Sequence, residues 1–61
     1  MNELIDGKRT LKVGQKKTYT SRSGAGKGKI VQMHMTQKGP YVTLFDAERA
    51  KNVSVRPSQV A

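Results

Sequence analysis

The sequence predicts a small all-β domain of about five short antiparallel strands. Short runs of residues alternate between apolar and polar side chains, as half-buried strands do. Glycine and proline separate these runs where turns are needed. No stretch repeats apolar residues at the helical spacing. With 61 residues and no cysteine, the chain forms one domain at most and has no disulfide to stabilise it.

The first part of the chain, residues 1–14, is predicted to be an N-terminal arm that contains at most one short strand. The segment around Leu4 and Ile5 is too short to distinguish a frayed arm from a single helical turn. Asp6-Gly7 is a turn signal, and residues 10–13 alternate as a short strand would.

The main unit, residues 15–61, begins with a polar strand at 15–20, whose lysines favour an edge position in a sheet. Residues 21–28 are predicted to be a Gly-rich loop, because three glycines at a spacing of two allow close approach of a ligand. The loop lacks the glycine spacing and the Lys-Ser/Thr pair of a nucleotide-binding Walker A loop.

Three further strands, at 29–36, 41–46 and 51–56, form a predicted meander. Ile30 breaks the alternation, so either a bulge points it inward or both faces of the strand are covered there. The residues predicted to face the core of this meander are Val31, Met33, Met35, Val42, Leu44, Val53 and Val55.

Turn residues connect these strands. Gly39 is suited to a positive φ, and residues 46–50 are predicted to form a hairpin loop in preference to a helical turn. Pro57 ends the last strand, and Val60 is expected to return to the core. Asp46 and Glu48 are expected to serve solubility or to pair with Arg49.

The charge is strongly basic, since 12 Lys and Arg stand against 4 Asp and Glu, for a net charge of +8. A field of that size on a small body attracts polyanions, and nucleic acid is the expected one. The chain has no apolar run long enough to span a membrane and no signal-peptide pattern at its start. We therefore expect a cytoplasmic protein that does not bind membranes and needs no cofactor.

Basic side chains on or beside the predicted sheet and its Gly-rich loop are the candidate contacts to phosphate. Tyr41 is added to them because its predicted exposed face could stack on a base. The predicted nucleic-acid-binding residues are Lys16, Lys17, Arg22, Lys27, Lys29, Tyr41, Lys51 and Arg56. The backbone amides of Gly24, Gly26 and Gly28 could add hydrogen bonds to phosphate. Aromatic residues are few, which favours backbone contacts on duplex DNA or structured RNA.

Few residues in the sequence form a pattern that could support catalysis. The single histidine, His34, has no serine or cysteine at a spacing that implies a triad, and no metal-ligand cluster is evident. We expect a binding protein and not an enzyme.

The segment Gly26-Lys27-Gly28-Lys29-Ile30-Val31 resembles the start of the KOW motif, with Gly28 as the motif glycine. The order of strands and turns over roughly residues 15–60 resembles a small SH3-like β-barrel. Val55-Arg56-Pro57-Ser58-Gln59-Val60 resembles the last strand and the turn that follow in many such barrels. This resemblance implies a partner among RNA, DNA, the ribosome and RNA polymerase.

The type II dihydrofolate reductases also use an SH3-like barrel, and Ser23-Gly24-Ala25 resembles their loop. Their active pore is lined by a Val-Gln-Ile-Tyr segment, whereas this chain reads Val53-Ser54-Val55-Arg56. Reductase activity is therefore not carried over. The main alternative to nucleic-acid binding is a protein-interaction adaptor that docks on transcription or translation machinery or on a second copy of itself.

Overall fold

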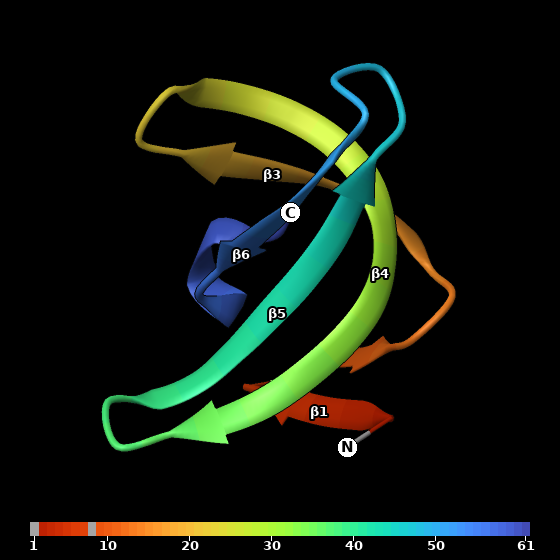
Figure 1. Cartoon of the computed structure of the whole chain (residues 1–61). Helices are drawn as coiled ribbons and strands as arrows, with labels where there is room; N and C mark the ends of the chain where they lie inside the picture. The colour runs from red at the N-terminus through yellow and green to blue at the C-terminus, as the bar shows by residue number, and fades with distance from the viewer. Residues whose placement is uncertain (1, 8) are drawn as a thin grey trace.

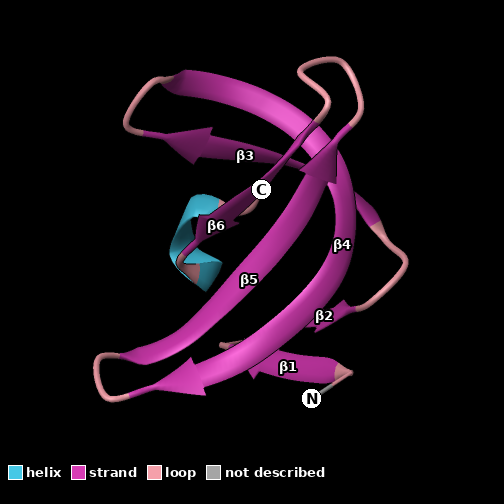
Figure 2. Cartoon of the chain, in the orientation of Figure 1, coloured by secondary structure: helices cyan, strands magenta, loops and turns pink. Residues whose placement is uncertain are grey.

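The computed structural model describes residues 2–7 and 9–61 and confirms an all-β fold built from two antiparallel sheets (Figure 1). The small sheet contains β1 (Glu3–Asp6) and β2 (Arg9–Lys12). The large sheet contains β3 (Lys16–Ser21), β4 (Gly24–Thr36), β5 (Gly39–Asp46) and β6 (Lys51–Val55). A 3-10 helix, η1 (Pro57–Gln59), follows β6 (Figure 2).

The large sheet has the strand order β3-β4-β5-β6 and is not a closed barrel, which corrects the sequence prediction. The edge strand β3 meets the segment that follows β6 through an isolated bridge between Tyr19 and Val60. Hydrogen bonds from the Ala61 amide to the Thr18 carbonyl at 2.8 Å and from the Gln59 side chain to the Thr20 carbonyl at 2.9 Å add to this contact. Closure by a full ladder fails because Pro57 has no N–H to donate and turns the chain into η1. The edge position predicted for the polar strand at 15–20 is confirmed.

The predicted Gly-rich loop at 21–28 is wrong, because β4 already begins at Gly24 and pairs with β3 along this stretch. β4 is the longest strand, with 13 residues, and it curves across the molecule between β3 and β5 (Figure 1). Two of its glycines are needed for packing. A Cβ on Gly26 would lie 2.7 Å from the Tyr19 hydroxyl, and a Cβ on Gly28 would lie 2.6 Å from the Phe45 carbonyl oxygen.

A register shift between Ile30 and Gln32 interrupts the pairing of β4 with β5. This bulge turns Ile30 into the core, where it is fully buried, and confirms one of the two sequence-based alternatives. The inward positions predicted for Val31 and Met35 are wrong, since these side chains are 43% and 62% exposed. Val31 is the extra residue of the bulge, and Met35 lies near the end of the β4–β5 hairpin, beyond the core.

One hydrophobic core joins both sheets. Its members are Leu11, Tyr19, Ile30, Met33, Val42, Leu44, Val55 and Val60. The inward positions predicted for Met33, Val42, Leu44 and Val55 are confirmed, as is the return of Val60 to the core. Val53 is partly buried against this cluster. Tyr19 is a large core residue that the sequence analysis did not predict, because its strand was interpreted as a polar edge strand.

The N-terminal residues form the antiparallel β1–β2 hairpin. Both predictions for this segment, a frayed arm or a single helical turn, are therefore wrong. Its turn uses Gly7 at a φ of 64°, as the turn signal predicted. Leu11 from β2 is fully buried in the common core. Hydrogen bonds of 2.8 Å from the Gly14 amide to the Ile30 carbonyl and from the Ile30 amide to the Gln15 carbonyl attach the connection to β4.

Gly28→Ala tests the steric role of the β4 glycines. The new Cβ would meet the backbone of Phe45, so we expect the free energy of unfolding to fall by roughly 1–3 kcal/mol. The neighbouring exposed change Lys27→Ala should stay within about 0.5 kcal/mol of the wild type. Urea unfolding followed by circular dichroism measures both, and equal stability of the two variants would contradict the packing argument.

Candidate functional site

The large sheet has one face on the core and one face toward solvent, because successive side chains of a strand point to opposite sides. We call the solvent side the outer face. It presents Lys16, Lys27, Lys29, Gln32, His34, Tyr41, Phe45, Asn52 and Ser54, and Thr43 lies on the same side but is buried.

One row of residues crosses all four strands of the outer face. Lys16 stands opposite Lys29, Lys29 opposite Phe45, and Phe45 opposite Asn52. Directly opposed residues of an antiparallel pair have Cβ atoms about 4.5–5.5 Å apart. The register therefore brings two lysines and an aromatic ring together from three different strands.

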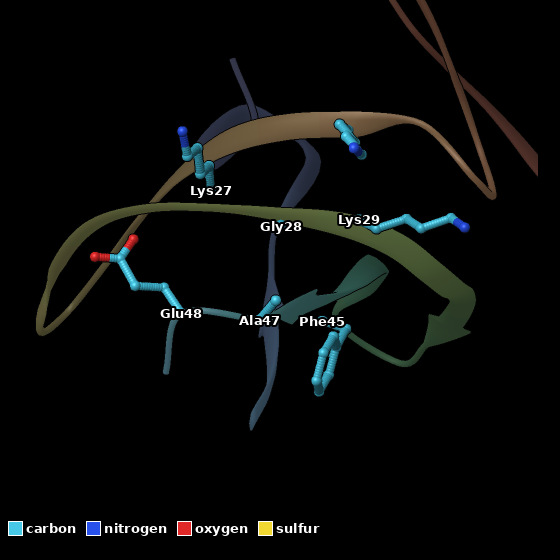
Figure 3. Close-up of a pocket in the computed structure, with 7 residues that line it drawn as sticks. Lys27, Gly28, Lys29, Phe45, Ala47 and Glu48 are labelled. Atoms are coloured by element: carbon cyan, nitrogen blue, oxygen red, sulfur yellow. The ribbon is translucent and has the colours of Figure 1, made fainter. Parts of the chain in front are cut away.

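A groove of about 410 Å³ opens around this row (Figure 3). It is lined by Lys16, Lys27, Gly28, Lys29, Phe45, Ala47 and Glu48. Figure 3 shows Lys27 and Lys29 on β4, Phe45 and Ala47 beside them, and Glu48 at the end of the groove away from Lys29. Three of the eight predicted site residues, all lysines, meet here.

The electrostatics of the groove favour an anion. Among the described residues, three of the four acids form ion pairs outside the lysine row, namely Glu3 with Lys12, Asp6 with Arg9 and Asp46 with Arg49. None of these pairs includes Lys16, Lys27 or Lys29. Like charges that stand directly opposite each other destabilise a sheet. Lys16 and Lys29 stand directly opposite each other, so a bound anion would reduce the repulsion between their charges.

A second cluster occupies the other end of β5. The His34 ring stacks on Tyr41 with a centroid distance of 6.1 Å, and the Arg56 guanidinium carbon lies 5.2 Å from the centre of the Tyr41 ring. Arg56 is oriented by a hydrogen bond to the Lys38 carbonyl at 3.0 Å. The predicted stacking surface of Tyr41 is thus already in contact with two side chains. Tyr41 and Arg56 share the outer face with the groove but do not line it.

The remaining predicted site residues are dispersed. Lys17 stands opposite Gly28 and shares the face of buried Tyr19. Arg22 lies in the turn between β3 and β4, and Lys51 begins β6 opposite Asp46. The sequence overlooked Phe45 as a site residue. Its alternation with Leu44 and its shared face with Tyr41 were the available signal, and its 41% exposure now makes it the open aromatic of the groove.

A polar network beneath the sheet holds the turn that carries Ala47 and Glu48. The Tyr19 hydroxyl donates to the buried Asp46 carboxylate at 2.6 Å. The same carboxylate accepts the Arg49 amide at 3.1 Å, and the Arg49 side chain donates to the Ala25 carbonyl at 3.1 Å. The expected pairing of Asp46 with Arg49 is confirmed, with a contact of 3.8 Å. This network fixes one wall of the groove against β3 and β4.

The Tyr19–Asp46 hydrogen bond shifts the pKa values of both groups. It holds the pKa of the Asp46 carboxyl below the ordinary 3.8, although burial works in the opposite direction. It also raises the pKa of the Tyr19 hydroxyl above the ordinary 10.0, and burial adds to that shift. The folded state therefore keeps a protonated donor and an ionised acceptor in this pair.

No protein-family model, curated protein or solved structure matches this chain. Within residues 2–7 and 9–61, no helix has the length and apolar character needed to cross a membrane. Over the same residues, no group of three or more histidine and acidic side chains is arranged to hold a metal ion.

The pH dependence of stability follows from the two shifts. The stabilisation from Asp46 is fully present above pH 3.8 and is lost as the pH falls through its lowered folded pKa. The stabilisation from Tyr19 is fully present below pH 10.0 and is lost as the pH rises through its raised folded pKa. Thermal melting from pH 2 to pH 12 should show a plateau between these limits.

Tyr19→Phe removes the donor and leaves a buried carboxylate with one fewer hydrogen bond. We expect the Tm at pH 7 to fall by at least about 5 °C, and the acid limb of the stability profile to move to higher pH. Tyr41→Phe is the matched control, because the Tyr41 ring contacts His34 and Arg56 without its hydroxyl. Equal changes in Tm for the two variants at pH 7 would contradict the role given to the Tyr19–Asp46 pair.

Proposed function

We propose that this protein binds nucleic acid through the outer face of its large sheet, with the lysine-lined groove as the centre of the interface. The observation that carries the proposal is the cross-strand juxtaposition of Lys16 and Lys29, with Lys27 beside them and Phe45 exposed in the same groove. Lysines contact phosphates and release condensed counterions, which gives affinity without sequence information.

The Arg56–Tyr41–His34 cluster supports an interface longer than the groove. It lies on the same face and on the same central strand, β5, as Phe45. Tyr41 and Phe45 are four residues apart, which corresponds to about 13 Å along a strand. A nucleic-acid backbone that follows β5 would meet cations at both ends of that path.

We also propose that the fold is a partly open relative of the SH3-like barrel, with Gly28 in the role of the KOW glycine. Support comes from the four-stranded meander, the 3-10 turn before the final bridge at Val60, and the close approach of Gly28 to the Phe45 backbone. We propose an accessory or regulatory binding role without catalysis, and the stacking of His34 on Tyr41 supports a binding role for this histidine.

A protein-interaction adaptor is the second candidate. Ile5 and Met35 favour it, because these apolar side chains are 73% and 62% exposed. Binding that depends on apolar side chains changes little with salt, whereas binding to phosphates weakens steeply. The salt response therefore separates the two functions.

The groove lysines are tested by a triple variant, Lys16→Gln, Lys27→Gln and Lys29→Gln, in fluorescence-anisotropy titrations with nucleic acid between about 50 and 200 mM salt. We expect weaker binding at every salt concentration and a dependence of log K on log salt that is less steep by up to about 3.

The matched control removes the same number of charges away from the groove, with Lys17→Gln, Lys38→Gln and Lys51→Gln. If the interface is the groove, the control variant keeps most of the wild-type slope. Identical losses in the two triple variants would show that net charge alone governs binding and would overturn the proposed interface.

Repulsion between the opposed Lys16 and Lys29 should also lower the stability of the unbound protein. We expect Lys29→Gln to raise the stability of the unbound protein by roughly 0.2–1 kcal/mol at low salt, because it removes repulsion from Lys16. Lys17→Gln is the control, since Lys17 stands opposite the uncharged Gly28. Differential scanning calorimetry at low and at high salt measures the effect, and a Lys29→Gln variant less stable than the control would count against the repulsion.

A further inference from the structure

We infer that the groove binds an unpaired base, stacked on Phe45, and that the preferred ligand of this protein is therefore single-stranded nucleic acid. The inference rests on the proposed function and makes it more specific. It departs from the expectation of duplex DNA or structured RNA, which depended on the low count of aromatic residues.

Phe45 is an aromatic residue outside the hydrophobic core. The core is complete without it, and its chain neighbours Leu44 and Asp46 point to the other face and are buried. An exposed aromatic ring on a sheet is a surface on which any base can stack. The backbone of Phe45 is held rigidly, because β5 pairs with β4 on one side and with β6 on the other, and Gly28 packs against its carbonyl.

The cations are arranged to accompany a stacked base. Lys29 stands directly opposite Phe45, and Lys16 follows one strand farther along the same row. Glu48 lies at the other end of the groove (Figure 3). Its carboxylate repels phosphate, which favours a path of the anionic backbone beside Lys16 and Lys29 while a base occupies the aromatic part.

A duplex cannot use this arrangement. Its bases are stacked on one another, and exposing one base face requires unpairing or flipping. A single strand or a loop presents base faces freely, and aromatic side chains with a basic groove are the usual means of recognising them. The Arg56–Tyr41–His34 cluster then provides a second contact point along β5 for the same strand.

The test compares a single-stranded oligonucleotide of about 12 residues, as DNA and as RNA, with a duplex of the same sequence. We expect the wild type to bind single strands at least about 10-fold more tightly than the duplex at equal salt. Phe45→Leu keeps an apolar side chain without an aromatic face, and it should weaken single-strand binding by about 5- to 100-fold. The slope of log K against log salt and the Tm should remain close to those of the wild type, because Phe45 carries no charge and lies outside the hydrophobic core.

Phe45→Trp restores stacking and supplies a fluorescent reporter in a chain that has no other tryptophan. Its emission should be quenched by single strands and not by the duplex. Equal affinity for single strands and duplex, or normal single-strand binding by Phe45→Leu, would overturn this inference and leave the proposed function standing. Failure of the wild type to bind any of these nucleic acids at low salt would overturn the proposed function and the inference with it.

Discussion

The hydrogen bond from the Tyr19 hydroxyl to the buried Asp46 carboxylate, at 2.6 Å, joins an edge strand to the end of the central strand β5. Gly26 leaves room for it, since a side chain there would collide with the Tyr19 ring. Arg49 completes the pair and ties the β5–β6 turn to the Ala25 carbonyl. A charged group buried this deeply is tolerated only when it is hydrogen-bonded and paired.

The outer face depends on that arrangement. β3 and β4 must stay in register for Lys16 to stand opposite Lys29, and the β5–β6 turn must stay closed for Ala47 and Glu48 to line the groove. The buried network secures both from the core side of the sheet. Stability is therefore concentrated on one face, while the other face carries opposed lysines and an open aromatic ring, features that weaken a fold and suit a ligand.

The sequence predicted the meander because alternation and turn residues are local signals. Val42, Leu44 and Val55 face the core as expected, and Gly39 adopts a φ of 110°. The prediction from the sequence was wrong where tertiary packing decides the local structure. Glycines 26 and 28 suggested a loop, yet they serve close packing in a strand. Tyr19 read as part of a polar edge because its partner, Asp46, lies 27 positions away in the chain. Lys16, Lys27 and Lys29 were predicted from their charge and their position on or beside the sheet and the Gly-rich segment, but only the cross-strand register brings them together around Phe45.

We propose that the outer face, and not the whole basic surface, is the ligand-binding surface. The most direct measurement is amide chemical-shift mapping of the protein during titration with a short single-stranded oligonucleotide. We expect the largest shifts along the row Lys16, Lys29 and Phe45, with smaller shifts toward Tyr41 and Arg56. Shifts concentrated instead on the β1–β2 hairpin, or spread evenly over all lysines, would contradict it.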